Sequence, residues 1–324
     1  SRGLGDVYKR QVQRRGLQFV AEVTFPKSES TPLADAEPNT AHQLHVKYAS
    51  APDGTMLAYG ILDDGDGLPV IVAQHFPDQL EFSWNRFGEM DRFKIYGRGR
   101  KLLRFDYRGC GLSDWDVEDL SFAAQSNDII TLADTAGFER FAVIATSSGA
   151  RHAVDLAARY PDRIAGLVLI AGYCDGRSLR SDDLNQTDPI LNMVKEGWNH
   201  RGQAFIFSYI SLYFPTASHE WTRKCAADFQ ASTNAENAAT VRDSNNKLSI
   251  KDMLERVQAP TLVVHSRDDA VHPLSEARKL TAGISGAEMV VMDSANMMAM
   301  PDEPSFAKEL QAVTNFLTGL EQSP

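Results

Sequence analysis

The sequence lacks an apolar run near the ~20 residues that a bilayer span needs, so we expect no transmembrane segment. Positive charge is scarce: 33 Lys and Arg stand against 43 Asp and Glu, which disfavours nucleic-acid binding by the chain as a whole. Cys110, Cys174 and Cys225 show no C-x-x-C spacing, which excludes a zinc motif and indicates a reducing, cytoplasmic location. No His, Cys, Asp or Glu residues show metal-ligand spacing either, so we expect no metal and no cofactor.

The N-terminal region reads differently from the rest of the 324 residues. Residues 1–11 (SRGLGDVYKRQ) look like a translated sequencing adaptor and are set aside. Residues 12–24 predict two short strands about a turn at Arg15-Gly16, and VQRRGLQFVAEV resembles the terminal wing of winged-helix, response-regulator DNA-binding domains; a generic N-terminal strand is the alternative. Residues 25–41 are rich in Ser, Pro, Glu and Thr and predict a linker. The resemblance implies that DNA would be bound only through a missing upstream domain.

Phe141 to Pro161, FAVIATSSGARHAVDLAARYP, is the most informative stretch. A short apolar run predicts a buried strand, a tight turn carries Ser147, and apolar residues at helical spacing predict a helix that Pro161 ends. Strand, turn and helix in this order are the context of a nucleophile elbow, whose usual sequence is G-x-S-x-G. Here Ala145 takes the first position and Gly149 keeps the last. The alternative is an ordinary strand–helix connection that contains a serine.

Strand and helix patterns alternate from residue 44 onward. Leu44, Val46 and Tyr48 alternate as in a half-buried strand, and a second strand follows a turn at Pro52-Asp53-Gly54. Later strands and helices alternate and predict a mostly parallel, doubly wound α/β sheet. Residues 175–257 are too long for a simple connection and are rich in aromatic residues. We therefore expect a helical cap over the carboxyl edge of the sheet, where ligands of α/β proteins bind.

One turn carries a specific resemblance. Asp106-Tyr107-Arg108-Gly109-Cys110-Gly111-Leu112-Ser113 matches the D-x-R-G-x-G-x-S turn of α/β-hydrolases, and residues 42–320 resemble that family. The longer run RFDYRGCGLSDWDVEDLS is similar to a bacterial subgroup often fused to winged-helix or LuxR-type regulators or to nucleotide cyclases.

The resemblance implies roles for individual residues. Ser147 would be the nucleophile, and the backbone N–H groups of Phe76 and Ser148 would form the oxyanion hole. The loop HSRDDAVHP (265–273) places Asp269 at the triad acid. Its neighbour Asp268 is expected to be solvated, and Asp175 is a weaker alternative acid.

The triad histidine is missing from its expected place. In the family it lies seven residues before the proline of the last helix, and that position is Met297 within SANMMAM (294–300). A thioether cannot accept a proton at neutral pH, and loss of one triad member costs roughly 10⁶ in kcat in a well-studied protease. His75 and His272 lie in loops near the predicted pocket and are possible substitute bases.

Two other histidines are weaker candidates for the base. His152 shares a helix face with charged residues and is expected to be exposed, whereas His265 should be a core or edge residue.

Two functions compete at this point. The first is a ligand-binding sensor domain of a transcriptional regulator with little or no hydrolase activity, its ligand small and largely apolar. The second is an esterase-like serine hydrolase that cleaves an acyl substrate with Ser147, Asp269 and a relocated base. A sequence error around residue 297 is a third reading.

Overall fold

The computed structural model describes residues 9–12, 16–19, 45–84, 86, 88–180, 189–199 and 204–322. The chain divides into two compact units, residues 1–43 and 44–324. In the first, β1 (Lys9–Val12) pairs antiparallel with β2 (Gly16–Phe19). β1 therefore begins within residues 1–11, the segment that looks like a translated sequencing adaptor. The predicted linker, residues 25–41, lies outside the described residues.

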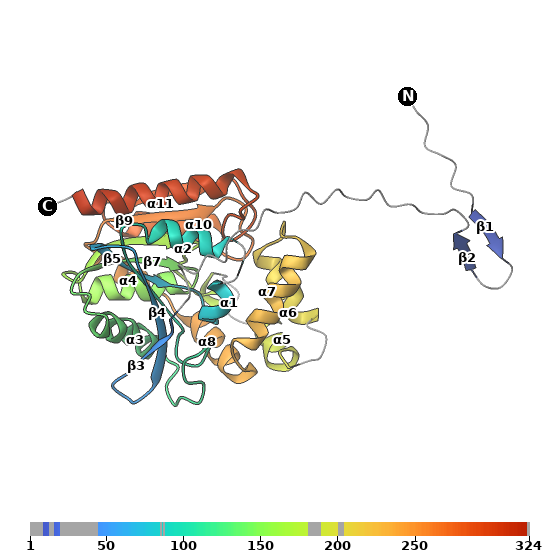
Figure 1. Cartoon of the computed structure of the whole chain (residues 1–324), viewed down its shortest axis with the longest axis horizontal. Helices are drawn as coiled ribbons and strands as arrows, with labels where there is room; N and C mark the ends of the chain where they lie inside the picture. Colours follow the sequence, from blue (N-terminus) through green and yellow to red (C-terminus); the bar gives the residue numbers. More distant parts are fainter. Residues whose placement is uncertain are drawn as a thin grey trace, which may run out of the picture. The chain divides into compact units, whose positions relative to one another are not determined.

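An eight-stranded sheet forms the centre of the second unit, in the order β10-β9-β8-β7-β5-β6-β4-β3. The first strands, β3 and β4, pair antiparallel, as do β4 and β6, and the other neighbours are parallel. This confirms the predicted α/β class (Figure 1). The strands are β3 (Lys47–Ser50), β4 (Met56–Asp63), β5 (Gly67–Ala73), β6 (Arg100–Phe105), β7 (Phe141–Thr146), β8 (Ile164–Ile170), β9 (Thr261–Ser266) and β10 (Glu288–Met292).

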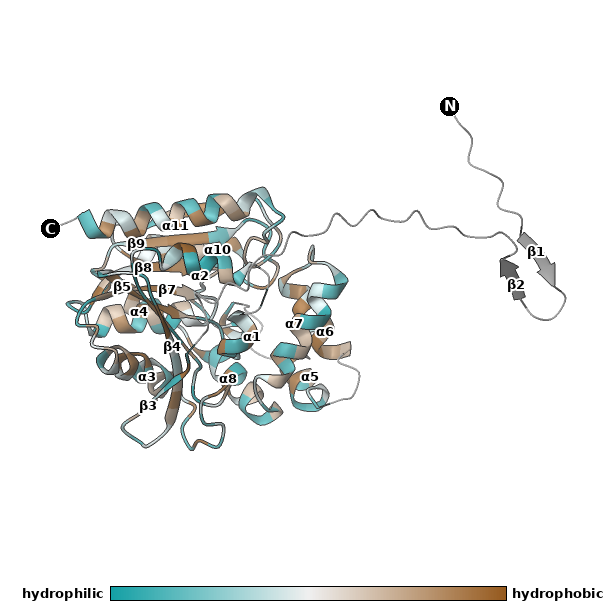
Figure 2. Cartoon of the chain, viewed as in Figure 1, coloured by the Kyte–Doolittle hydropathy of each residue, from teal (hydrophilic) through white to brown (hydrophobic). Residues whose placement is uncertain are grey.

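Helices cover both faces of the sheet, as the buried apolar clusters show. One cluster joins a face of the sheet to α3 (Phe122–Thr135), α4 (Gly149–Arg159), α9 (Lys251–Leu254) and α10 (Leu274–Gly283). The other joins the opposite face to α1 (Leu80–Trp84), α2 (Glu89–Tyr96) and α11 (Pro304–Gln322). Figure 2 shows the strands as largely hydrophobic and the helices as mixed, as expected for a sheet buried on both faces.

The edge strand β3 corrects one expectation. Tyr48, predicted to face inward, is 52% exposed, whereas its neighbour Ala49 is buried. Ala49 joins the cluster that contains Ile129 and Leu132 of α3. Since successive strand residues point to opposite faces, the packing of α3 on one face reverses the predicted alternation.

Four cap helices follow β8 and build a small core of their own. In the part of the cap that the structure describes, they are α5 (Pro189–Gly197), α6 (Ala204–Tyr213), α7 (His219–Ala231) and α8 (Ala235–Lys247), and a 3₁₀ turn, η2 (Arg177–Leu179), precedes them. Trp198, Ile206 and Phe229 belong to this core. In Figure 1 the cap helices lie beside the sheet, at the right of the unit.

Two loops of the sheet domain fasten the cap. The turn carrying the D-x-R-G-x-G sequence bonds the α7–α8 connection: Thr233 Oγ1 donates to Gly109 O (2.6 Å), and Gly111 N donates to Ser232 O (2.7 Å). The loop after β10 bonds the end of α6, where Met297 N donates to Tyr213 O (2.8 Å). The sequence motif thus serves here as an attachment point for the cap.

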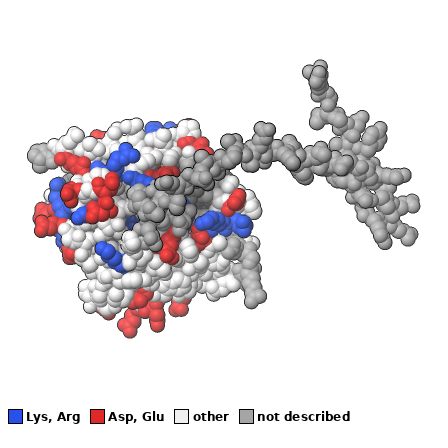
Figure 3. All heavy atoms as spheres, in the orientation of Figure 1, with Lys and Arg blue, Asp and Glu red and all other residues white. Residues whose placement is uncertain are grey.

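The described surface carries charges of both signs. On the face shown in Figure 3, Lys and Arg side chains are interspersed with Asp and Glu. That face therefore has no continuous basic stripe of the kind that follows a phosphate backbone. Of the helices in the described ranges, none combines the length and apolarity that crossing a membrane requires.

Candidate functional site

Ser147 lies on a strained turn between β7 and α4. Its φ of 51° is in the left-handed region, which non-glycine residues seldom adopt outside functional sites. Gly149 makes the turn possible, because a Cβ there would lie 2.2 Å from Ala73 O of β5. At the first position of the elbow, the methyl of Ala145 is fully buried in β7. The sequence departure from G-x-S-x-G is thus accommodated.

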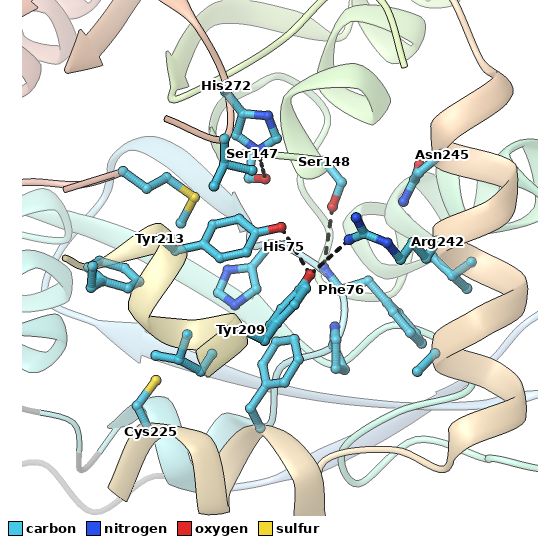
Figure 4. A pocket seen from close by; sticks show the side chains of 18 of the residues that line it. His75, Phe76, Ser147, Ser148, Tyr209, Tyr213, Cys225, Arg242, Asn245 and His272 are labelled. Atoms are coloured by element: carbon cyan, nitrogen blue, oxygen red, sulfur yellow. Dashed lines mark hydrogen bonds between the residues drawn. The ribbon is translucent and has the colours of Figure 1, made fainter. Parts of the chain in front are cut away.

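The loop between β9 and α10 brings His272 to this serine. His272 Nε2 lies 2.9 Å from Ser147 Oγ, a hydrogen-bonding distance (Figure 4). The imidazole stacks on Tyr173, with ring centroids 4.3 Å apart. An imidazole from a different loop therefore occupies the place beside the serine that sequence spacing had assigned to residue 297.

The predicted acid, Asp269, holds the loop and makes no hydrogen bond to the imidazole. Its Oδ1 accepts the backbone N–H groups of Val271 (2.8 Å) and His272 (2.9 Å). Its Oδ2 is buried and has no hydrogen-bond partner among the described residues. Burial raises the pKa of Asp269, and the two backbone N–H groups oppose that shift.

A cation, Arg180, faces the second nitrogen of the histidine. Arg180 Nη2 lies 3.4 Å from His272 Nδ1. A guanidinium can only donate, so Nδ1 must be the acceptor and a neutral ring carries its proton on Nε2. The Nε2–H group then donates to Ser147 Oγ. In this tautomer His272 cannot take the serine proton.

The electrostatics of the site favour the neutral ring. Burial lowers the pKa of His272 well below 6.5, and the guanidinium of Arg180 lowers it further. In the usual triad a carboxylate at Nδ1 stabilises the imidazolium that forms during attack. Here a cation stands at that nitrogen, so protonation of His272 is disfavoured.

One of the two predicted oxyanion donors, the backbone N–H of Phe76, already has a partner in the protein. Phe76 N donates to Ser148 Oγ over 3.3 Å (Figure 4). The N–H expected to bind a developing negative charge is therefore already bonded to a hydroxyl. His75, the other candidate base, lines the same pocket and stacks near Phe229, with centroids 6.2 Å apart. Its Nδ1 has no hydrogen-bond partner in the described residues, and burial lowers its pKa.

The remaining predicted residues fall into two groups. Met297 is buried and lines the pocket. Asp175, in the loop after β8, pairs with Lys279 of α10 (2.7 Å), and Asp268 is exposed as expected.

Of two histidines away from the serine, one differs from its expected burial and one agrees with it. His152, expected to be exposed, is buried: Nδ1 bonds Ser126 Oγ at 2.9 Å and the ring stacks on Phe122. The exposure prediction was wrong because α3 covers that face of α4. His265 is buried, and its Nε2–H donates to His272 O (2.7 Å).

A cavity of about 110 Å³ opens beside the serine. This is roughly ten times the 10–15 Å³ that one water needs, so the cavity has room for a small organic molecule. Apolar and aromatic cap side chains form much of its wall, with several arginines. The wall includes His75, Phe76, Ser147, Ser148, Tyr173, Arg177, Arg180, Val194, Trp198, Tyr209, Ile210, Tyr213, Phe229, Arg242, His272 and Met297. In the described ranges, no three His, Cys, Asp or Glu side chains gather as metal ligands would.

Family and structural comparisons agree with this architecture. The family described as "Serine aminopeptidase, S33" matches residues 92–295, well over half of the chain. The chain therefore belongs to that family of α/β-hydrolases. Solved structures with the same fold include an enol-lactonase from Burkholderia xenovorans LB400 (TM-score 0.67, 19% identity, 86% of this chain and 100% of that one). A hydrolase from Pseudomonas aeruginosa PA01 gives a TM-score of 0.68 at 19% identity, over 86% of this chain and 99% of that one.

Sequence relatives carry hydrolase names. A putative carbamate hydrolase RutD of Rhizobium rhizogenes is 28% identical over 205 residues, 60% of this chain and 74% of that protein. A 2-hydroxy-6-oxononadienedioate/2-hydroxy-6-oxononatrienedioate hydrolase of Klebsiella pneumoniae is 25% identical over 275 residues, 82% of this chain and 92% of that protein.

Two residues of the site were missed by the sequence analysis. Arg180 lies at the start of the cap and Tyr173 just after β8, where no sequence motif marks them. The available signal for Arg180 was its position shortly after β8, the strand next to β7. The carboxyl ends of adjacent parallel strands lie at the same edge of a sheet, so a residue there can reach Ser147.

Proposed function

We propose that the chain is a slow serine hydrolase of acyl bonds, with Ser147 as nucleophile and His272 as base. The observation that carries the proposal is the 2.9 Å contact between Ser147 Oγ and His272 Nε2. A nucleophile and a base within hydrogen-bonding reach are the minimum for covalent acyl transfer. The names of the relatives, a carbamate hydrolase and a dienedioate hydrolase, also describe hydrolytic enzymes.

The reaction would proceed through an acyl-enzyme. Ser147 Oγ attacks the substrate carbonyl carbon while its proton passes to His272 Nε2, and the leaving group departs with that proton. Water then attacks the ester of Ser147 while its proton passes to the same nitrogen, and that proton returns to Ser147 Oγ as the C–O bond to the serine breaks and the acid is released. Before attack the ring must carry its proton on Nδ1, which the contact with Arg180 opposes. In a serine protease the wrong histidine tautomer costs about 10⁴ in kcat, hence the slow turnover.

A fluorophosphonate probe tests the proposal. We expect Ser147 to be labelled over hours, detected by intact mass and peptide mapping, and S147A to remain unlabelled. H272Q should label at least about tenfold more slowly, because general base catalysis contributes roughly 10²–10⁴. H219Q, a cap histidine that forms no part of the proposed dyad, is the matched control. A folded wild-type protein that takes up no probe within a day contradicts the proposal.

A second candidate is the ligand sensor of a larger transcriptional regulator, without turnover. The Arg180 contact at Nδ1 favours it, because this contact disables the base while the pocket remains open. The β1–β2 hairpin, read as the wing of a winged-helix domain, is the sequence support for a regulator. Ligand-induced thermal stabilisation without probe labelling would support this candidate. The complete open reading frame of the locus, tested in a DNA-binding assay, would check the regulator itself.

A further inference from the structure

Arginine is the recurrent charged residue of the pocket wall. Among the described residues, Arg86, Arg177, Arg180 and Arg242 line it, with Glu89 as the carboxylate. Glu89 lies 3.6 Å from Arg92, and Arg86 lies 3.7 Å from Asp78. Glu89 and Asp78 thus pair with arginines other than Arg180, and the ion pair of Arg180 itself is the longer one with Glu276.

Arg180 is held in place by neutral groups. Its Nε donates to Asp175 O (2.8 Å) and its Nη1 to Val271 O (2.9 Å), and these carbonyls orient the guanidinium without neutralising it. The carboxylate of Glu276 lies 3.9 Å from Nε, beyond hydrogen-bonding distance. Glu276 is engaged by Lys279 at 2.7 Å and by the N–H groups of Cys174 and Asp175.

The guanidinium retains donors for a ligand. Of its five N–H groups, three are used by the two carbonyls and by His272 Nδ1. Arg180 lines the cavity, and its side chain is 15% exposed. Guanidinium and carboxylate match in shape and charge, and such bonds are about twice as strong as neutral ones.

The remainder of the cavity suits an apolar body. Val194, Trp198, Ile210 and Phe229 of the cap contribute to its wall. A ligand that satisfies both features is a small carboxylate attached to an aromatic or alkyl group.

We propose that Arg180 is the docking point for a carboxylate of the substrate or ligand, and that its occupation arms His272. A bound carboxylate accepts from the unused N–H groups of Nη1 and Nη2, and in the arming step this pairing draws the guanidinium, and with it the other Nη2–H, away from His272 Nδ1. The ring proton then moves to Nδ1 by exchange with solvent, which leaves the Nε2 lone pair free to accept from Ser147. The docking step stands on Arg180 alone, whereas the arming step rests on the proposed hydrolase function.

Calorimetry with benzoate and benzamide tests the docking step without reference to activity. The two probes have nearly the same shape and differ in charge. Benzoate should bind the wild-type protein at least about tenfold more tightly than benzamide, as a charge-assisted pair predicts. R180M should lose this preference, R180K should keep part of it, and R267M, at an exposed arginine paired with Asp293, should behave as wild type. A preference that persists in R180M, or equal binding of the two probes by wild type, overturns the proposal.

The histidine tautomer tests the arming step. With ¹⁵N-labelled histidine and H272Q to assign the signal, the proton should be on Nε2 in the free protein and on Nδ1 with benzoate bound. In wild type the half-ester mono-p-nitrophenyl glutarate should have a higher kcat than p-nitrophenyl butyrate, and R180M should abolish the difference. Benzoate binding through Arg180 without a change of tautomer overturns arming. A change of tautomer without any turnover or labelling leaves docking in place and refutes the hydrolase.

Discussion

At the scale of single residues, the imidazole that contacts Ser147 comes from His272 and not from residue 297. The sequence showed that residue 297 cannot be the base, and the structure places His272 beside Ser147 instead. Spacing within one loop is visible in a sequence, but the approach of two loops depends on sheet order and on the length of each loop. For this reason the turn that carries Ser147 could be predicted, whereas His272 could be given only as one of two alternative bases and Arg180 not at all.

A double variant tests whether both loops reach the serine. H272A should reduce p-nitrophenyl butyrate hydrolysis at least about tenfold, as expected for loss of a general base. Adding Met297→His in that background should recover activity, because Met297 lines the same pocket as Ser147. Steady-state kinetics measures both steps, and M298H in the same background, at a residue that also lines the pocket, tests whether recovery is specific to position 297. No recovery in a folded double variant would show that residue 297 is not the usual histidine position.

His152 makes stability depend on pH. Burial, reinforced by Arg151, lowers its pKa from 6.5 to about 3. Below pH 6.5 the unfolded chain binds a proton there that the native protein does not bind, so this stabilisation is lost as pH falls from 6.5 towards 3. Urea unfolding should show that H152Q loses about 1 kcal/mol less than wild type between pH 6 and 5. Parallel pH profiles for the two proteins would contradict this assignment.

At the scale of elements, strands and helices were predictable wherever one periodicity dominates. β9 (Thr261–Ser266) and α3 (Phe122–Thr135, with Ser121 as its N-cap) belong to the alternating strands and helices that the sequence predicts. No helix was predicted between β5 and β6, because α1 and α2 are short and show little helical periodicity of apolar residues. Such short helices form because tertiary packing stabilises them.

The loop from β9 to α10 gives a prediction that separates this site from an ordinary triad. Asp269 positions His272 through two backbone N–H groups. D269N keeps an acceptor and should retain probe labelling of Ser147 within about threefold, where an orienting acid would cost about 10⁴. D269A removes the acceptor and should lower stability by about 1–2 kcal/mol and labelling as well. D268N, at the exposed neighbour, is the control, and a collapse of labelling in D269N would restore the ordinary triad role.

At the scale of the whole molecule, the predicted α/β-hydrolase fold is confirmed. It could be predicted because strand and helix patterns alternate along the sequence. The three buried clusters of the second unit all lie within residues 49–317. A protein beginning at residue 44 should therefore keep its melting temperature within about 2 °C, which corresponds to less than about 1 kcal/mol. Calorimetry on the two lengths checks this. A larger drop would mean that residues 1–43 stabilise the second unit.

The loop that contains Asn296 and Met297 helps to attach the cap. Asn296 Nδ2 donates to Thr216 Oγ1 (2.5 Å) and Met297 N donates to Tyr213 O (2.8 Å), so this loop is attached to the end of α6. Tyr213 meets the imidazole of His272 edge-on, with ring centroids 6.2 Å apart. A displacement of the end of α6 would therefore act on two neighbours at once, the loop at residue 297 and the imidazole of His272. The way a ligand enters the cavity and the orientation of His272 would then be coupled through Tyr213.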